Sequence, residues 1–514
     1  MEISMQSIRS LLAGTALAIL AASGVQADQA PAPTIEKHFA EIAQRTPELT
    51  AFLRAMPKGG DLHSHLVGSA YAEEYIAWGI RENMCADTKR LRIVDPPCDK
   101  AAGKPPLGEA TRNLWFYGEL VDSLSTRNYR LGHETGRKKF FTSFDGFDAV
   151  TEIDAGPAYN LASAVRRAAD QNILYLELMF SEGMRAARKI GKATPWNDDP
   201  AKLRQTLLKA GVAELAKKTR KVYDKMEADA EKHLGCPAAQ KPSAAPLCGV
   251  TVRYIASLKR IVPKKPLFAE LVHAFELVKT DPRIVGINLV GPEDAPITLA
   301  TYKTQMELIG ALKKLMPEVP VSLHAGELTI GMVPPRHLRS HIRDAVEIAK
   351  ASRIGHGIDI MHEDRPYQLL KTMAKRKVLV EINLTSNDII LGIKGSDHPF
   401  PTYLKHGVPL AISTDDEGVA RINLTYEYRR AVQSYDLTYA HGKTLSRNSL
   451  TYAFLKGESL WRDAAKGKIR TECESDPASR ACRAFLDKNA KAKLQWRLEE
   501  AYRDFEKAVQ ARLR

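Results

Sequence analysis

Short apolar runs alternate with helical patterns eight times between residues 58 and 458, and this alternation constrains the fold more than any other feature. The runs are almost continuously apolar, as expected of strands covered on both faces. Strand and helix in regular alternation favour a parallel sheet, and eight repeats predict an α/β protein with a (β/α)8, or TIM, barrel. The predicted strands are Gly60–Leu66, Ile173–Phe180, Val250–Ser257, Ile284–Val290, Val319–Ala325, Ser352–Gly355, Val378–Leu384 and Pro409–Thr414.

Four further segments lie outside this alternation. They are an N-terminal helical segment, two insertions that follow the first and second strands and each carry a cysteine pair, and a charged helical tail. Their boundaries are 28–57, about 81–144, about 182–248 and 459–514. Within the first of them, Ile35–Ala55 is amphipathic and is interrupted near Pro47. This face could pack on the barrel or join two copies of the chain, and we favour a homodimer.

The first 27 residues have the pattern of a secretory signal peptide. Arg9 precedes an apolar run over Leu11–Ala22, and Val25-Gln26-Ala27 offers small residues for cleavage. An uncleaved N-terminal anchor is the alternative. No other run reaches the roughly 18 apolar residues that a spanning helix needs. We therefore expect a periplasmic or secreted protein with no membrane span after cleavage.

The six cysteines form three local pairs along the chain. The pairs are Cys85 with Cys98, Cys236 with Cys248, and Cys473 with Cys482. Behind a signal peptide, such pairs predict three local disulfides. Free thiols become the better interpretation only if the chain stays in the cytosol.

The chain is basic, with a net charge of +14 and a pI of about 9.3. Such a charge could attract nucleic acid, anionic glycans or membrane headgroups. Acidic residues are interleaved with the basic ones, however, which favours a generally cationic surface. Because no nucleic-acid-binding motif accompanies the charge, we expect no nucleic-acid partner.

Histidines and an aspartate follow the predicted strands. His63 and His65 are one residue apart in a strand, so their side chains point to the same side. His324 ends the fifth run, His356 follows the sixth, and Asp415 ends the eighth. Each feature alone has an ordinary explanation, such as a core histidine or a helix N-cap. Together they lie at the carboxyl ends of barrel strands, where active sites are assembled, and they predict a metal site.

The donor types favour zinc. Imidazole and carboxylate are zinc ligands, and a catalytic zinc keeps one position open for water. A two-metal hydrolase of this kind would usually have a bridging lysine near the end of the fourth strand, and Val285–Val290 contains none. We therefore expect one Zn²⁺ per chain, held by three histidines and one aspartate.

The fragments that carry these residues resemble the adenosine deaminase family, within the metal-dependent amidohydrolases. The matching fragments are Met56–His65, Gly286–Glu293, His324–Glu327, Arg353–Gly357 and Ser413–Asp416. The signal peptide, the helical segment before the barrel and the cysteine-bearing insertion are similar to the secreted, growth-factor-type branch.

The resemblance implies zinc-dependent hydrolysis of adenosine or 2′-deoxyadenosine to inosine or 2′-deoxyinosine and ammonia. It implies that His63, His65, His324 and Asp415 hold the zinc. It also implies that Glu327 protonates purine N1 and that His356 orients the attacking hydroxide. It further implies that Asp416 contacts N7, that Gly291 offers its N–H to N3, that His65 lies at the substrate, and that Asp415 takes part in catalysis.

Several positions depart from the family pattern. Val67 stands where a ribose-binding aspartate is common, Asn288 replaces a common aspartate, Glu417 replaces a proline, and Asn383–Asn387 replaces a Cys/Ser-Pro pattern. The alternatives are therefore deamination of adenine, an N6-substituted adenosine or a nucleotide. Pro334–Arg339 is basic but matches no phosphate-binding motif. A secreted binding protein with secondary catalysis is a further alternative from a different class.

Overall fold

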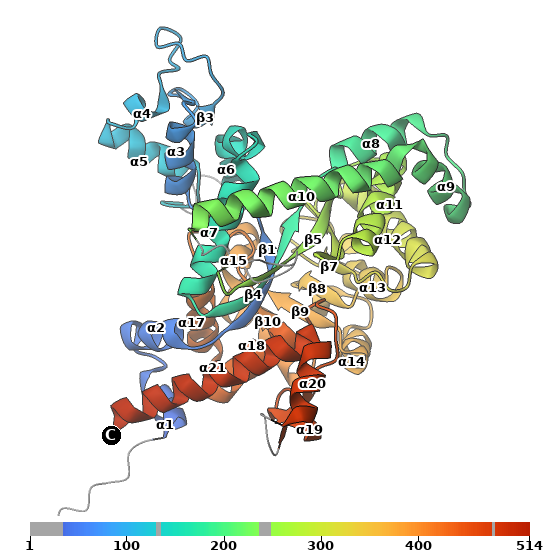
Figure 1. The fold of residues 1–514 in the computed structure, drawn as a ribbon. Coiled ribbons are helices and arrows are strands. Elements are labelled where there is room, and N and C mark those ends of the chain that lie inside the picture. The colour runs from blue at the N-terminus through green and yellow to red at the C-terminus, as the bar shows by residue number, and fades with distance from the viewer. Residues whose placement is uncertain (1–33, 130–134, 236–247, 475–478) are drawn as a thin grey trace, which may run out of the picture.

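Eight parallel strands form the centre of the molecule, and helices surround them (Figure 1). The computed structural model describes residues 34–129, 135–235, 248–474 and 479–514. The barrel strands are β1 (Gly59–His65), β4 (Ile173–Phe180), β5 (Thr251–Lys259), β6 (Ile284–Val290), β7 (Ser322–Ala325), β8 (Arg353–His356), β9 (Leu379–Ile382) and β10 (Leu410–Ile412).

Backbone pairing closes the barrel. The strands form two four-stranded parallel sheets, ordered β1-β4-β5-β6 and β10-β9-β8-β7. Parallel bridges from Ser64 to Asp415 and from Ile287 to Val321 join the sheets at both edges. Each predicted strand coincides with one barrel strand, so the (β/α)8 barrel is confirmed.

The covering helices follow the strands in turn. They are α11 (Lys264–Thr280), α12 (Pro296–Leu315), α13 (His341–Glu347), α14 (Pro366–Arg376), α15 (Leu384–Leu391), α16 (Phe400–Lys405), α17 (Leu424–Tyr435) and α18 (Tyr439–Thr451). Helix α11 is buried along almost its whole length, because α8 (Met184–Ala193) and α10 (Ala213–Leu234) cover its outer side. Proline at the first turn of α12 and α14 fits a helix start, where its missing N–H costs nothing.

The segment between β1 and β4 projects from the barrel with its own apolar core (Figure 1). It contains α3 (Ala72–Arg81), β2 (Cys85–Asp87), β3 (Arg92–Val94), α4 (Leu107–Ala110), α5 (Leu114–Ser123) and α6 (Gly136–Glu152), and it ends in α7 (Gly156–Asp170), which packs on β4 of the barrel. The rings of Tyr75 and Phe147 stack at 4.2 Å in this core. The predicted disulfide Cys85–Cys98 is present.

The segment between β4 and β5 is helical. Its elements are α8, α9 (Pro200–Leu207), the π-helical turn η1 (Leu208–Val212) and α10. Helix α10 packs along α7 and α11. The predicted pair Cys236–Cys248 includes Cys236, which lies outside the described residues.

The two ends of the described chain pack together beside the barrel. Helix α1 (Ile35–Ile42) contacts α18 and the final helix α21 (Ala490–Leu513), and α2 (Thr46–Ala55) contacts α17. The Phe52 ring lies 5.1 Å from that of Phe505, and the Phe39 ring lies 5.9 Å from that of Tyr439. The chain's own C-terminal helices therefore cover the apolar face of this segment, and the homodimer stays a prediction.

The tail before α21 contains a hairpin, β11 (Trp461–Asp463) and β12 (Lys468–Ile469), and two short helices, α19 (Thr471–Glu474) and α20 (Arg480–Lys488). The predicted disulfide Cys473–Cys482 joins these two helices. The predicted signal peptide, residues 1–27, lies outside the described residues. Among the helices that the structure describes, none has the length and apolar character to cross a membrane.

Candidate metal centre

The five predicted metal and catalytic residues at the strand ends gather at the carboxyl end of the barrel. His63 and His65 come from β1, His324 from β7 and His356 from the end of β8, while Asp415 follows β10. His63, His324, His356 and Asp415 each offer one nitrogen or oxygen atom that could bind a metal, and these atoms all lie within 4.8 Å of one another. Strands that are far apart in sequence therefore bring one nitrogen- and oxygen-rich centre together.

The closest contacts in this centre join imidazole nitrogens to each other and to one carboxylate. His63 Nε2 lies 3.1 Å from His324 Nε2, and His65 Nε2 lies 3.3 Å from the same atom. Asp415 Oδ1 lies 3.1 Å from His65 Nε2 and 3.4 Å from His63 Nε2. The four predicted zinc ligands thus surround one small space.

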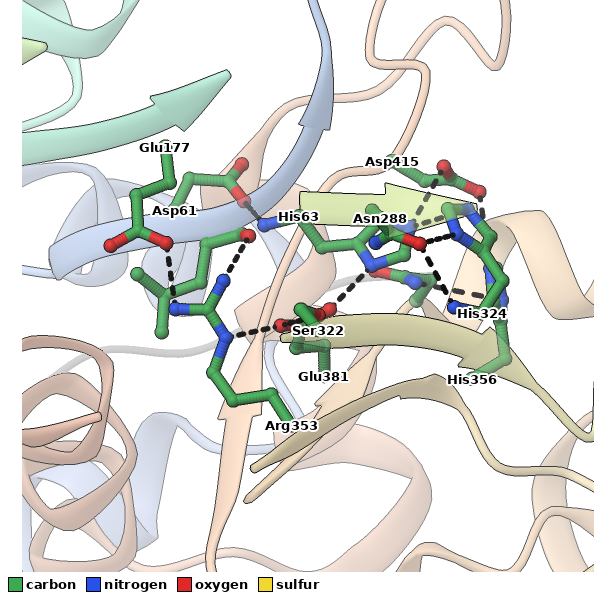
Figure 2. A network of polar contacts seen from close by, with 12 residues as sticks. Asp61, His63, Glu177, Asn288, Ser322, His324, Arg353, His356, Glu381 and Asp415 are labelled. Atoms are coloured by element: carbon green, nitrogen blue, oxygen red, sulfur yellow. Dashed lines mark hydrogen bonds and ion pairs between the residues drawn. The ribbon is translucent and has the colours of Figure 1, made fainter. Parts of the chain in front are cut away.

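The outer partners of two histidines show what belongs in that space (Figure 2). His63 Nδ1 lies 2.6 Å from Glu381 Oε2, and His324 Nδ1 lies 2.9 Å from Asn288 Oδ1. Both oxygens accept hydrogen bonds, so each ring carries its proton on Nδ1 and turns an Nε2 lone pair inward. The two Nε2 atoms are 3.1 Å apart, and their lone pairs repel unless a cation lies between them. A metal-bound histidine usually has such an acceptor on its other ring nitrogen.

Backbone strain marks the same residues. His356 has φ +68° and Asp415 has φ +61°, in the left-handed region that non-glycine residues rarely adopt. Such conformations cost about 1–3 kcal/mol each and persist where the surrounding structure enforces them, often at functional sites. Here the strain turns both side chains toward the centre.

The carboxyl groups differ in protonation. Burial alone would raise the pKa of Asp415, but its contacts with the imidazoles of His63 and His65 outweigh burial and hold the pKa well below its usual range. Burial and the charge of the neighbouring Asp415 together raise the pKa of Asp416 to about 7, against the pull of His65. Burial, followed by the charge of Asp415, raises the pKa of Glu327 well above its ordinary value. The centre therefore combines one anionic carboxylate with two carboxyl groups whose pKa values are raised.

Glu293 binds the backbone of the loop that carries Glu327. The Glu293 carboxylate accepts hydrogen bonds from the backbone N–H groups of Gly326 (3.0 Å) and Glu327 (2.9 Å). His341 Nδ1 lies 2.7 Å from the same carboxylate, and Arg260 Nη1 lies 3.6 Å from it. These contacts fix the backbone of Glu327, the predicted general acid.

A buried ionic network lies behind His63 and was not predicted from the sequence. Figure 2 shows Arg353 between two carboxylates, with Nη1 2.7 Å from Glu177 Oε2 and Nε 2.6 Å from Glu381 Oε1. Ser322 Oγ also donates to Glu381 Oε1, at 2.9 Å. Glu381 thus receives a cation on one oxygen while its other oxygen holds His63. The available signal was a glutamate inside an otherwise apolar strand.

The departures from the family pattern have local explanations. Val67 packs into the apolar core of the projecting segment, so this position offers no polar group to a sugar. The Glu417 carboxylate accepts hydrogen bonds from Arg167 Nε (3.2 Å) and Gln171 Nε2 (3.3 Å). Asn288 supplies the acceptor for His324 described above.

Two glycines shape the space around the predicted purine contacts. A Cβ atom at Gly68 would lie 1.6 Å from Asp416 Oδ1, so only glycine fits beside that carboxyl. Gly291 follows β6 with φ +96°, and none of the described residues beyond its chain neighbours comes within 4 Å of the position of a Cβ there. Its backbone is therefore open to a ligand at the end of the strand.

Comparison with known families gives a match over more than half of the chain. The family model described as "Adenosine deaminase" matches residues 118–462. An adenosine deaminase of Enterococcus faecalis is 32% identical over 197 residues, which is 38% of this chain and 50% of that protein. One from Clostridium perfringens is 28% identical over 164 residues, 32% of this chain and 46% of that protein. The chain thus spans about half the length of the curated relatives it matches.

Solved structures share the fold at low identity. An adenine deaminase from Arthrobacter aurescens matches with a TM-score of 0.52 at 16% identity, over 87% of this chain and 99% of that one. The ADAL protein of Arabidopsis, complexed with IMP, matches with a TM-score of 0.52 at 20% identity, over 88% and 99%. An amidohydrolase from Burkholderia ambifaria with bound Zn matches with a TM-score of 0.50 at 16% identity, over 88% and 94%.

Proposed function

The chain belongs to the adenosine deaminase family, and from this premise we propose that it is a hydrolytic aminohydrolase of adenosine and 2′-deoxyadenosine that works outside the cytoplasm. Water adds to C6 of the purine, ammonia leaves, and inosine or 2′-deoxyinosine is the product. The observation that carries the proposal is the pair of inward Nε2 lone pairs on His63 and His324 beside anionic Asp415.

These donors fit one zinc ion, with His63, His65, His324 and Asp415 as its ligands. The zinc bound by the Burkholderia amidohydrolase supports this choice. A zinc ion held there would supply Lewis acidity and lower the pKa of water toward neutrality. The chain's own groups hold the ligands in place, because Glu381 and Asn288 fix the orientation of two of the imidazoles.

Glu327 is the proton donor to purine N1. Addition of water at C6 requires the ring nitrogen N1 to accept negative charge, and a neutral carboxyl can neutralise it. Burial keeps the Glu327 proton in place, and the Glu293 contacts to the backbone of Gly326 and Glu327 fix its position. The same carboxyl group can then move a proton from the added oxygen to the departing nitrogen.

Asp416 and Gly291 recognise the base. Purine N7 only accepts hydrogen bonds, so Asp416 must be protonated to bind it, and its raised pKa of about 7 supports that state. Gly291 donates its backbone N–H to N3. Both contacts are common to adenosine and 2′-deoxyadenosine.

Substrate choice depends most on the sugar, or on the group that replaces it on the base, because the Val67 side chain offers no hydrogen bond to a ribose. Two proteins of similar fold are deaminases of other aminopurines, N6-methyl-AMP and adenine. The basic run Pro334–Arg339 gives little support to a nucleotide substrate, since Arg339 is paired with Asp364 at 2.6 Å. A nucleoside remains the substrate we propose.

Disulfides support a location outside the cytoplasm. Cys85–Cys98 and Cys473–Cys482 are both formed, and such bonds persist in oxidising compartments. Cell fractionation, with mass measurement of the mature N-terminus, tests this directly. A protein that stays in the cytosol with its N-terminus intact would contradict the proposed location.

A substrate panel tests the activity. Purified zinc-loaded protein is mixed with adenosine, 2′-deoxyadenosine, adenine, AMP and N6-methyl-AMP, and ammonia release is followed. We expect turnover of the two nucleosides, abolished in His324→Ala and Glu327→Gln. Turnover of only adenine or a nucleotide would refute the proposed substrate. No turnover of any compound by metal-loaded protein would refute deamination and favour the binding-protein alternative.

A further inference from the structure

Behind the His356 ring, Asn387 and then His398 are linked to it in series, and neither has a role in the reaction proposed above. Asn387 Nδ2 lies 2.9 Å from His356 Nδ1, and His398 Nε2 lies 3.2 Å from Asn387 Oδ1. The backbone N–H of Phe400 lies 3.0 Å from His398 Nδ1. We call the series Phe400 N–H, His398, Asn387 and His356 the tautomer chain. All four residues are buried.

The Phe400 amide sets the direction of the tautomer chain. A backbone N–H can only donate a hydrogen bond, so His398 Nδ1 must carry a lone pair. Burial lowers the pKa of His398 to about 3, so the ring is neutral and its single proton lies on Nε2. His398 Nε2–H therefore donates to the oxygen of Asn387.

This donation fixes the Asn387 amide in turn. If the amide were flipped, its NH₂ group would face the His398 N–H, and two donors would meet at 3.2 Å. With its oxygen on His398, Asn387 turns its NH₂ group toward His356 and donates to Nδ1 at 2.9 Å. His356 Nδ1 must therefore carry a lone pair, and the proton of the neutral ring lies on Nε2.

Other groups near His356 Nδ1 do not change this conclusion. Glu327 Oε1 is 3.8 Å away, which is too far for a hydrogen bond. Asn383 Nδ2, at 3.5 Å, is a second amide donor facing the same lone pair. On the opposite side of the ring, His356 Nε2 lies 4.0 Å from Asp415 Oδ2 and has no hydrogen-bond partner among the residues that the structure describes.

His356 thus differs from the other histidines of the centre. The acceptors Glu381 and Asn288 place the proton of His63 and of His324 on Nδ1, whereas the donor Asn387 places the proton of His356 on Nε2. A ring with Nε2–H cannot ligate a metal through that atom, but it can donate a hydrogen bond to an oxygen in the centre.

We propose that Asn387 and His398 are positioning residues that hold His356 as the Nε2–H tautomer. His356 is thereby excluded from the metal's ligands and presents a hydrogen-bond donor to the oxygen of the attacking water. The role toward water rests on the proposed function, whereas the tautomer itself does not.

Nuclear magnetic resonance of the metal-loaded, full-length protein reads the tautomer directly. Long-range ¹H–¹⁵N correlation of ¹⁵N-histidine-labelled protein distinguishes Nε2–H, Nδ1–H and doubly protonated rings, and His356→Gln assigns the signal. We expect His356 and His398 both to carry the proton on Nε2. A His356 proton on Nδ1, or on both nitrogens, overturns the proposal in the unmodified protein.

The Asn387→Asp variant reverses the direction of the hydrogen bond between residue 387 and His356, because a carboxylate accepts hydrogen bonds from both histidines. We expect the His356 proton to appear on Nδ1 and kcat to fall about 10²-fold, the scale of a lost proton donor. Asn160→Asp is the matched control. Asn160 is buried in the projecting segment, where it binds Tyr75 and Gly156, and its variant should keep the His356 pattern.

An unchanged His356 tautomer and an unchanged kcat in Asn387→Asp would overturn the positioning role. If that variant does not fold, the spectrum of the unmodified protein still decides the tautomer. An Nε2–H signal in a protein that turns over no aminopurine would instead refute the proposed function and leave the tautomer chain standing.

Discussion

Replacing Glu381 with Gln tests whether the ionic network behind His63 tunes the metal centre. The change keeps the size of the side chain but removes the charge that faces His63 Nδ1 at 2.6 Å and Arg353 Nε at 2.6 Å. A neutral amide oxygen is a weaker acceptor, and the flipped amide would present a donor to His63 Nδ1–H. In either arrangement the inward Nε2 lone pair is less basic and less well oriented.

Two effects of the substitution can be estimated separately. Loss of an outer partner of a metal-binding histidine typically lowers metal affinity by about 10–100-fold. Arg353 is buried and keeps Glu177 at 2.7 Å as its one remaining carboxylate. Breaking one half of a buried ion pair costs about 3–5 kcal/mol, so the free energy of unfolding should fall by that amount.

Competition with a fluorescent chelator measures zinc affinity, and urea unfolding measures stability. Glu270→Gln is the matched control. Glu270 is a fully buried glutamate on α11, outside the centre, and its Oε1 lies 2.7 Å from Arg188 Nε. It should lower stability without changing zinc affinity. The reasoning is refuted if Glu381→Gln binds zinc as tightly as the unmodified protein, or if Glu270→Gln weakens zinc equally.

Three further outcomes are expected. Glu327→Gln should lower kcat about 10²–10⁴-fold while its zinc content, measured by mass spectrometry of the metal, stays unchanged; retained turnover would remove Glu327 as the acid. Burial lowers the pKa of His273 from an ordinary value of about 6.5 to about 4. The part of the free energy of unfolding that depends on its neutral ring is therefore complete above about pH 6.5 and is lost as pH falls through 4, a change of about 3 kcal/mol in all. Urea unfolding at several pH values should show a smaller loss over this interval in His273→Asn, and an equal loss would exclude the assignment. Replacing Cys473 and Cys482 together by serine should lower the free energy of unfolding by about 2–3 kcal/mol, and an unchanged urea midpoint would show that this disulfide contributes nothing.

The barrel and the convergence of its catalytic residues could be predicted from local patterns. Continuous apolar runs identify buried parallel strands, and residues placed at their ends must meet, because all carboxyl ends of a parallel barrel share one face. His63, His324 and Asp415 were found this way, although they span most of the chain. The order of the strands and the meeting of their ends follow from the fold class alone.

The partners of these residues could not be predicted, because they depend on register between distant strands. Glu381 and His63 are separated by 318 positions. Periodicity places Glu381 on a strand, but it does not say which neighbouring side chain the carboxylate meets. In the sequence, Asn387 is only part of a departure from the family pattern and His398 carries no assigned role, because the hydrogen bonds that join them to His356 exist only in the folded chain. Asn288 similarly counted as a departure until its oxygen was found on His324 Nδ1.

The most direct test of the central claim is a zinc titration of metal-free protein with adenosine as substrate, in which ammonia release is measured at each step. The account predicts no turnover without metal, a linear rise, and a plateau at about one zinc per chain, as expected for one open catalytic site. Turnover by the metal-free protein, or a plateau that requires two ions, would contradict it.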